Sequence, residues 1–478
     1  MSSVKKNYIY NLLYQVLLII TPLFTAPYIS RRLGPQMIGI QSFYYSVVTY
    51  FVLFCMLGVL NFGNRSIAKV RNNRQELTKT FWTIYGFQFI RSIIITFIYF
   101  AYVLIFAREY FVIAIINGLY VIAALLDISW MFFGLEQFKI TVTRNIIIKL
   151  LNVVCIFLFI KGPEDLWIYS LITVLSTLLS NGYLWFYLKR YVGWYRPKFS
   201  EIKNNIKPEL ILFVPAIAVS LYKVMDRIML GIFSNEAQLG FFTSSESVIN
   251  IPMSLITALG TVMLPRITNM IANGENEKIK EYIENSIFFV VMMSIAMTFG
   301  LAAIAPTFAP VFFGEEFSEC SPIIIGLSIT IIFISWANVI RTQYLIPRGK
   351  DKSYLISIIF GAVINLIINF LLIPKFEAIG AVVGTVCAEA TVCITQTMMV
   401  RKNLPIRKYI LDNIIFILFG IIMFIGVRSV GSFFANKILR LLIEIVVGII
   451  IYCGLISIYL IRIKQINIFY NFKIKEKL

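Results

Sequence analysis

The sequence predicts an all-α protein that crosses a membrane many times, because its composition, its long apolar runs and the placement of its basic residues agree. Hydrophobic residues make up 59% of the 478 residues and charged residues 14%, with a mean hydropathy of +0.83. Soluble domains carry about 25% charged residues. The net charge of +19 comes from Lys and Arg in short loops between apolar runs, so it indicates membrane topology and no nucleic-acid partner.

Apolar runs of about 20 residues, each long enough to cross a bilayer as a helix, recur along the chain. They predict fourteen transmembrane helices, near 8–29, 38–60, 80–106, 110–134, 145–161, 166–188, 209–233, 241–264, 285–311, 321–346, 354–373, 378–400, 409–427 and 438–461. With both chain ends on one side, 31 of the 43 basic residues fall on that side and 8 on the other. We therefore expect both termini in the cytoplasm. The remaining four basic residues lie deeper within predicted helices, namely Arg91, Lys223, Arg227 and Arg341, because basic residues within four residues of a helix end are counted with the adjoining loop.

The chain contains an internal repeat. An offset of 201 residues superposes four pairs without a gap: Gly39 on Gly240, Arg65 on Arg266, Asn72 on Asn273 and Glu76 on Glu277. Further along, the tripeptide 128–130 matches 334–336, and each Trp is followed seven residues later by Gln, at Gln137 and Gln343. Asn152 then matches Asn365. Six helices therefore repeat as a unit.

Because six is an even number, both copies enter the membrane in the same direction, and we expect a pseudo-twofold axis along the membrane normal. The predicted architecture is two six-helix lobes around a central cavity, followed by two unrepeated helices. The expected boundaries are 1–190 for the first lobe, 191–207 for a basic cytoplasmic linker, 208–401 for the second lobe, and 402–478 for the last two helices with a basic cytoplasmic tail.

The helix predicted at 209–233 carries three charged residues on one face. Lys223, Asp226 and Arg227 fall at i, i+3 and i+4, so their side chains project together. Such charges cost roughly 2.5–3.5 kcal/mol each inside a bilayer, so the face should line water or protein. Two interpretations remain open, an internally neutralised cluster and a substrate-binding site.

The helix predicted at 241–264 has a polar stripe at helical spacing, formed by Glu246, Asn250, Ser254, Thr257 and Thr261. A polar stripe of this length is costly against lipid. We interpret it as part of the cavity wall, and packing against the preceding helix is the alternative.

Arg91 and Asp127 lie at similar depths in two predicted neighbouring helices, which favours a structural salt bridge over a role with substrate or protons. Glu389 lies in mid-membrane without an obvious local partner, whereas Glu444 has Arg440 one turn away. Glu389 is therefore a candidate for proton coupling, with a hidden hydrogen-bonded role as the alternative.

Arg31 and Arg32 end the first predicted helix on the outer side, against the rule for basic residues. They either contact lipid headgroups or, together with Lys223 and Arg227, make the outer half of the cavity positive. A cationic, water-filled vestibule suits a phosphorylated or otherwise anionic substrate.

Several classes of function are excluded or not indicated. The six cysteines show no paired spacing, so neither a disulfide framework nor a metal site is indicated. Histidine is absent, which excludes imidazole-based catalysis. No phosphate-binding glycine loop, nucleophile elbow or room for a soluble catalytic domain is found. We expect a protein that is not an enzyme and uses no cofactor.

Three segments carry a resemblance to a known family: RRLGPQMIGIQSF at 31–43, DISWMFFGLEQFK at 127–139 and DRIMLGIFSNEAQLGFF at 226–242. They resemble the polysaccharide repeat-unit flippases of the multidrug/oligosaccharidyl-lipid/polysaccharide exporter superfamily, and the resemblance covers essentially the whole chain. The second segment is the most specific of the three.

The resemblance implies a multipass protein of the bacterial cytoplasmic membrane that flips undecaprenyl-diphosphate-linked oligosaccharides to the outer leaflet by alternating access, for capsule, exopolysaccharide or O-antigen synthesis. It implies Arg31, Arg32, Lys223 and Arg227 as residues that hold the diphosphate. Sugar contacts would come from wall residues, namely Tyr222, Glu246, Asn250 and Thr257. Membrane lipids, a polysaccharide polymerase and a chain-length regulator are the other partners it implies.

Other functions stay open at this point. A cation-coupled multidrug antiporter of the same fold would need an acidic cavity, and the basic residues on the candidate face argue against it. Flippases for lipid II or teichoic-acid precursors are closer alternatives. A membrane-embedded glycan polymerase or ligase would need a large outer loop, and the predicted outer loops are short. Coupling to protons or sodium is not decided by the sequence.

Overall fold

The structure is a computed structural model that describes residues 2–463. Within that range, the side chains of residues 2–16, 18–19, 211–216, 218–219, 221–223 and 462–463 are not described. Every regular element in the described range is helical. The helices form two compact units: unit 1 is Met1–Thr243 with Ile373–Ala378, and unit 2 is Ser244–Leu372 with Ile379–Leu478.

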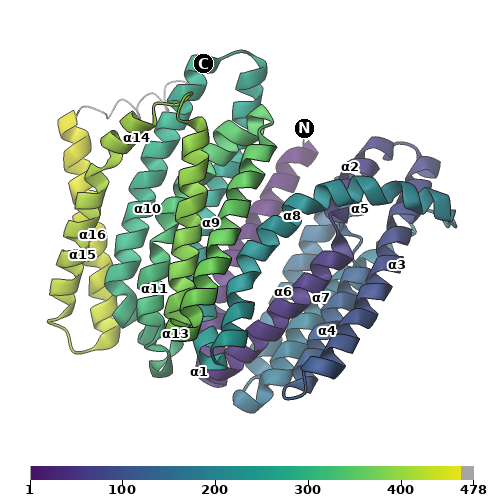
Figure 1. Cartoon of the computed structure of the whole chain (residues 1–478), viewed down its shortest axis with the longest axis horizontal. Coiled ribbons are helices and arrows are strands. Elements are labelled where there is room, and N and C mark those ends of the chain that lie inside the picture. Colours follow the sequence, from purple (N-terminus) through teal and green to yellow (C-terminus); the bar gives the residue numbers. More distant parts are fainter. Residues whose placement is uncertain (1, 464–478) are drawn as a thin grey trace. The chain divides into compact units, whose positions relative to one another are not determined.

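Unit 1 is a bundle of membrane-length helices closed at one end by short ones (Figure 1). Its helices are α1 Ser2–Met56, α2 Val59–Val70, α3 Arg74–Phe106, α4 Phe111–Leu125, α5 Ser129–Gly134, α6 Phe138–Phe159, α7 Leu166–Leu188 and α8 Phe199–Phe233. Helix α1 packs on α4 and α6, and α4 packs on α3 and α7. The core between them holds apolar residues such as Leu33, Ile40, Tyr99 and Val121.

Helix α1 is two segments joined at Gly34, where φ is 74° and ψ is 171°. Glycine reaches positive φ without steric cost, and the next residue, Pro35, needs no backbone donor in the first turn of the second segment. The chain therefore reverses direction here, and the two segments correspond to the first two predicted helices.

Unit 2 contains most of α9 Glu236–Ala272, whose first residues belong to unit 1, and the helices that follow it. These are α10 Asn276–Phe313, α11 Cys320–Ser328, α12 Thr330–Ile340, α13 Asp351–Val400, α14 Ile406–Asn413, α15 Ile415–Gly431 and α16 Lys437–Ile463. Helix α13 is broken at Glu377, where φ is 49°. The predicted pair is present in α16: buried Glu444 accepts a hydrogen bond from Arg440 Nε at 2.9 Å.

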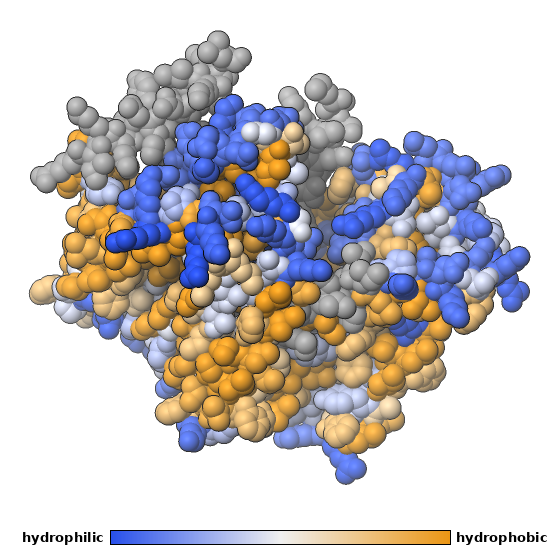
Figure 2. Space-filling model, turned by 45° about the horizontal axis from the view of Figure 1, so that its top comes forward, coloured by the Kyte–Doolittle hydropathy of each residue, from blue (hydrophilic) through white to orange (hydrophobic). Residues whose placement is uncertain are grey.

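The structure confirms a multipass membrane protein. Eleven helical stretches in the described part are long and apolar enough to cross a membrane. Two of them, Ile20–Val70 and Asp351–Val400, contain the breaks at Gly34 and Glu377. In the space-filling view hydrophobic residues cover much of the visible surface, and hydrophilic residues gather in patches on it (Figure 2). The count of fourteen transmembrane helices and the lobe boundaries remain predictions.

Three helices begin at least seven residues before the apolar runs that predicted them. Helix α6 starts at Phe138 where we expected about 145, α8 at Phe199 where we expected about 209, and α10 at Asn276 where we expected about 285. Polar residues fill these additional turns, so hydropathy does not detect them. As a result, Lys149 and Glu209 lie several turns inside their helices.

Side-chain hydrogen bonds stabilise the connection between α4 and α5. Gln88 Nε2 donates to the carbonyl oxygens of Ala124 and Asp127, both at 2.9 Å, and Trp130 Nε1 donates to Gln88 Oε1 at 3.0 Å. Asp127 Oδ1 accepts from the backbone N–H of Ser129 at 2.8 Å. The segment that carried the most specific resemblance thus builds a helix break whose polar groups are satisfied.

The predicted salt bridge between Arg91 and Asp127 is wrong. Arg91 Nη1 instead pairs with Glu209 Oε2 of α8 at 3.0 Å, and its Nε donates to the carbonyl oxygen of Cys55 at 2.8 Å. Glu209 is fully buried and Arg91 is 8% exposed. The sequence analysis did not consider Glu209, the first residue of the helix predicted at 209–233, and Asp127 instead accepts from the backbone N–H of Ser129.

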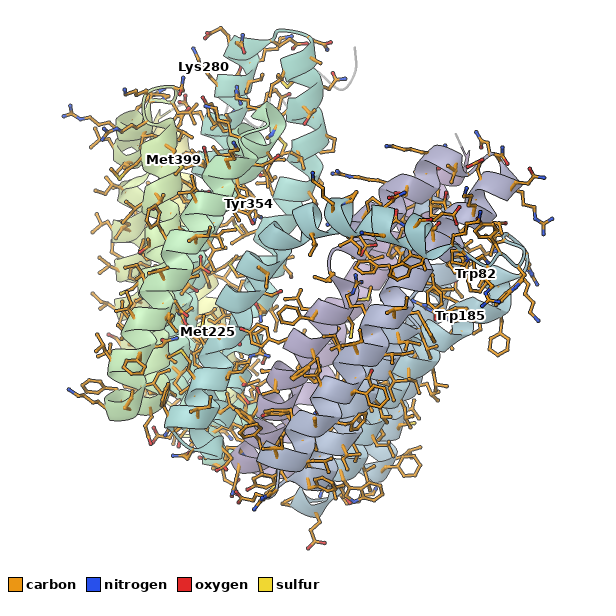
Figure 3. All side chains as sticks on the ribbon, turned by 45° about the vertical axis from the view of Figure 1, so that its right-hand side comes forward. Trp82, Trp185, Met225, Lys280, Tyr354 and Met399 are labelled. Carbon is orange, nitrogen blue, oxygen red and sulfur yellow. The ribbon has the colours of Figure 1, made fainter. Side chains whose placement is uncertain are left out.

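The chain between α7 and α8 is tied to the start of α3. Trp82 Nε1 donates to the carbonyl oxygen of Gly193 at 2.8 Å, and Lys79 Nζ pairs with Glu201 Oε1 at 3.0 Å. Trp82 and Trp185 lie at this end of unit 1 (Figure 3). Together with the buried pair between Arg91 and Glu209, these contacts hold the first turns of α8 against α3.

The repeat is visible as a reciprocal contact inside unit 1. A Cβ atom on Gly39 would overlap the carbonyl oxygen of Glu236, and a Cβ atom on Gly240 would overlap that of Pro35. These residues are related by the offset of 201, and so are Ser42 and Thr243, whose hydroxyl oxygens lie 2.7 Å apart. Contacts that repeat with the partners exchanged are what a local twofold axis produces.

We expect Gly39→Ala to destabilise the protein by about 1–3 kcal/mol, because the added methyl group overlaps backbone that cannot move aside. Gly182→Ala is the matched control: nothing lies within 4 Å of that position in α7, so the substitution should stabilise by up to about 1 kcal/mol through helix propensity. Thermal unfolding of both variants in detergent measures the difference. Equal stability of the two variants would contradict the close contact.

Replacing only Arg91 or only Glu209 with Leu should destabilise unit 1 by about 3–5 kcal/mol, because the remaining charge is buried without a partner. The double variant should be more stable than either single variant, and unfolding of all four proteins gives the coupling energy. Lys437→Ala, which breaks an exposed pair with Glu315, is the control and should have little effect. Additive single effects would argue against the pair.

Glu201 lies near the start of α8. Its pKa is lowered to about 2 by a hydrogen bond from the backbone N–H of Lys198 and by hydrogen bonds from the side chains of Lys79 and Tyr195. A lowered pKa stabilises the folded state above the ordinary pKa of Glu, and that contribution is lost as pH falls toward 2. Glu201→Gln should therefore lower the melting temperature at pH 7, and the difference from the unsubstituted protein should shrink between about pH 5 and 3. A difference that does not change with pH would contradict this assignment.

Candidate functional site

The first two predicted diphosphate ligands lie at the end of the first segment of α1. Arg31 and Arg32 are both exposed. Arg32 Nη1 donates to the carbonyl oxygen of Lys161 at 3.4 Å, and its guanidinium lies 5.6 Å from the ring centroid of Tyr28. Tyr28 is itself held by a hydrogen bond to the carbonyl oxygen of Ile160 at 2.7 Å. Arg32 is therefore oriented by α6, and both arginines remain accessible to an anion.

The charged face of α8 is described only in part. Asp226 is 6% exposed and Arg227 is partly buried, and both take part in interactions within the protein. Asp226 lies within electrostatic reach of Tyr50 in the second segment of α1. The side chains of Lys223 and Tyr222 lie outside the described residues, so their predicted roles stay predictions.

The polar stripe of α9 lies on an accessible face. Asn250 and Thr261 are exposed, and Glu246, Ser254 and Thr257 are partly buried. Thr257 Oγ1 donates to the carbonyl oxygen of Met253 at 3.0 Å, and Ser254 and Thr261 bond to carbonyl oxygens of their own helix in the same way. These hydroxyls are satisfied locally, so the cost of facing lipid is smaller than the sequence argument assumed. Asn250 is then the stronger candidate for a sugar contact.

The remaining candidate site residues lie in different units. Glu389 lies in α13 of unit 2, where it is partly buried and interacts with other groups of the protein. Arg91 and Asp127 lie in unit 1, where each has a structural role. The local contacts of Arg91 and Asp127 leave neither side chain available to a ligand.

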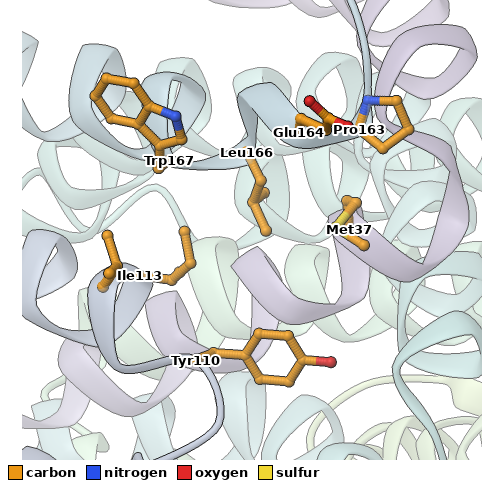
Figure 4. A pocket seen from close by; sticks show the side chains of 8 residues that line it. Met37, Tyr110, Ile113, Pro163, Glu164, Leu166 and Trp167 are labelled. Atoms are coloured by element: carbon orange, nitrogen blue, oxygen red, sulfur yellow. The ribbon is translucent and has the colours of Figure 1, made fainter.

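Unit 1 also has a groove of about 400 Å³ where α1, α4 and α7 come together (Figure 4). Its walls are almost entirely apolar, and Glu164 is the single charged residue among those that line it: Met37, Tyr110, Val112, Ile113, Pro163, Glu164, Leu166 and Trp167. None of the predicted site residues lines this groove. An apolar groove with one carboxylate does not suit a phosphate group.

Two basic residues that the sequence analysis did not select as site candidates lie on α6. Arg144 is 7% exposed and donates from Nη1 to the carbonyl oxygen of Ser180 at 2.6 Å and from Nη2 to Asn145 Oδ1 at 2.8 Å. Lys149 lies farther along the helix and is partly buried. The signal that would have found Arg144 is the run of polar residues before the apolar segment, which is part of the helix, whereas Lys149 already lies inside the segment predicted at 145–161.

Comparisons with known proteins agree with the membrane fold. The chain is 24% identical over 393 residues to a protein of Escherichia coli K12 named "Putative O-antigen transporter", covering 81% of this chain and 94% of that one. Its fold matches the lipid II flippase MurJ in an inward closed conformation with a TM-score of 0.75, at 14% identity, over 96% of this chain and 99% of that chain.

A second structural match has a TM-score of 0.64. It is an inward-facing multidrug resistance MATE transporter of the MOP superfamily, 16% identical, matched over 84% of this chain and 98% of that chain. At these identities the structural matches establish the fold. In sequence, the family model described as polysaccharide biosynthesis protein matches residues 4–271. That match spans more than half of the chain, and the protein therefore belongs to this polysaccharide biosynthesis family.

Proposed function

We propose that this protein flips undecaprenyl-diphosphate-linked oligosaccharide repeat units from the cytoplasmic to the outer leaflet by alternating access, for synthesis of a cell-surface polysaccharide. The observation that carries the proposal is the match along nearly the full length of a relative named as an O-antigen transporter, within a family of polysaccharide biosynthesis proteins. The fold shared with a lipid II flippase supports it, because lipid II flipping is the same type of transport.

The physical task explains the need for such a protein. Moving a diphosphate and several sugars through hydrocarbon is prohibitive, since each polar group loses its water without replacement. A polar site exposed alternately to each face replaces that water. Arg31, Arg32 and Arg227 are accessible or partly accessible cations on α1 and α8, and with Lys223 they are our proposed diphosphate ligands.

The proposed location is the bacterial cytoplasmic membrane with both termini in the cytoplasm, which follows from the bias of basic residues toward one set of loops. In this orientation Arg31 and Arg32 face the outer side. The protein carries out transport and not catalysis, and we propose a polysaccharide polymerase and a chain-length regulator as its partners in the membrane.

We expect the double variant Lys223→Ala/Arg227→Ala to abolish polymer export while still reaching the membrane, because the diphosphate loses two charge-assisted contacts. The assay is complementation of a strain that lacks its O-antigen flippase, with surface polymer as the readout and membrane content measured by immunoblot. Lys69→Ala, which removes an exposed charge on α2, is the control and should complement fully.

The same assay separates the alternatives. Full complementation by the double variant would refute the cationic site. Rescue of a strain depleted of its lipid II flippase, without rescue of polymer export, would identify a lipid II flippase. Resistance to cationic drugs without either rescue would identify a multidrug transporter of the same fold.

A further inference from the structure

Lys149 of α6 is a cation in the middle of a membrane helix without a protein carboxylate to neutralise it. It lies eleven residues after the first residue of Phe138–Phe159 and ten before the last, which places it about 15 Å from either end of the helix. No ion pair or side-chain hydrogen bond involves Lys149 among the described residues. A charge at this depth is costly when left uncompensated.

Neighbouring helices cannot supply the missing negative charge. Helix α6 packs mainly on α1 and α7, and more lightly on α5. None of these three helices contains an Asp or Glu at any position. Three other basic residues inside described membrane helices have partners within the protein: Arg91 has Glu209, Arg144 has Ser180, and Arg341 has Asn338.

Lys149 points away from lipid. Five apolar residues of α6 are 52–60% exposed: Ile147, Leu151, Val154, Leu158 and Phe159, the last residue of the helix. At about 100° per residue the first four lie about 140–180° around the helix from Lys149 and mark its lipid face. Lys149 lies instead between the side that packs on α7 and the side that packs on α1.

The surroundings of Lys149 are polar and already satisfied. One turn before it, Asn145 Oδ1 accepts from Ser180 Oγ at 3.2 Å, and one turn after it, Asn152 Nδ2 donates to Ser176 Oγ at 2.9 Å. On the other side, Phe157 packs against Tyr28 of α1 with ring centroids 4.6 Å apart. The ammonium group is thus only partly buried, on an inward face whose amides are held by α7.

We propose that Lys149 binds the diphosphate of the lipid-linked substrate as it passes the middle of the membrane. This inference rests on the proposed function and adds a phosphate ligand in α6, apart from the cations of α1 and α8. The face of the helix identifies the source of the phosphate: phospholipid headgroups stay at the edges of a hydrocarbon core about 30 Å thick, so a transported headgroup is the phosphate that reaches an inward-facing cation within a membrane helix. An ammonium group is a strong ligand for such an oxyanion.

The test uses the full-length protein in nanodiscs and undecaprenyl diphosphate as the probe, with undecaprenol as the phosphate-free reference. Lys149→Gln should weaken diphosphate binding about 10-fold, the loss expected for one hydrogen bond to a charged group. Lys149→Arg should retain most of the affinity because it keeps the charge. Lys139→Gln, which removes an exposed charge from the first turn of the same helix, should bind as the unsubstituted protein does.

Thermal unfolding of the same samples separates binding from a structural role. Because Lys149 has no partner to lose, Lys149→Gln should melt at the same temperature as the unsubstituted protein or higher. Equal affinity of Lys149→Gln and the unsubstituted protein, or a lower melting temperature with unchanged affinity, would overturn the role of Lys149 and leave the proposed function standing. An unsubstituted protein that binds undecaprenyl diphosphate no better than undecaprenol would overturn both.

Discussion

A charged side chain inside a membrane is stable only where another charge, a hydrogen-bonding group or water replaces its hydration. This requirement determines how the charged side chains inside unit 1 are arranged. Arg91 meets it through Glu209 and the carbonyl oxygen of Cys55. Arg144 meets it through Ser180 and Asn145. Both arrangements join helices that would otherwise meet through apolar contacts alone, so the charges specify which helices are neighbours.

Charged side chains that have a structural role in the protein are not available to bind a ligand. Arg91 and Asp127 have structural roles, because the first is in an ion pair and the second accepts from the backbone N–H of Ser129 at the start of a short helix. Arg31 and Arg32 are exposed at the end of the first segment of α1, where Arg32 also donates to the carbonyl oxygen of Lys161, and Lys149 lies in the middle of α6. A diphosphate that crosses the membrane needs cations at more than one depth, and these residues lie at two depths along the bundle.

The contact between the repeated segments depends on a different constraint, the absence of side chains. Gly39 and Gly240 bring two helices so close that each would meet the backbone of the other if it carried a Cβ atom. Small residues allow such approaches in membranes, where packing replaces the hydrophobic effect as the force between helices. The hydroxyl pair of Ser42 and Thr243 lies next to this contact and adds a hydrogen bond. This contact therefore joins residues that the offset of 201 relates in the sequence.

The sequence by itself determined the membrane class, the family resemblance, the positions of most helices and the offset of the repeat. Apolar runs and equivalent residues are local properties, and composition and spacing reveal them directly. The starts of α6 and α8 were placed too late, because the polar residues of their first turns form helix without adding hydropathy.

Only the tertiary structure decided which charges pair. Glu209 reaches Arg91 because the linker ties α8 to α3, across 118 positions of sequence. Asp127 is equally acidic and closer in the chain, yet its carboxylate accepts from the backbone of Ser129. Partner choice depends on which helices are adjacent and how they are rotated, and these are properties of the packed bundle that no single segment contains.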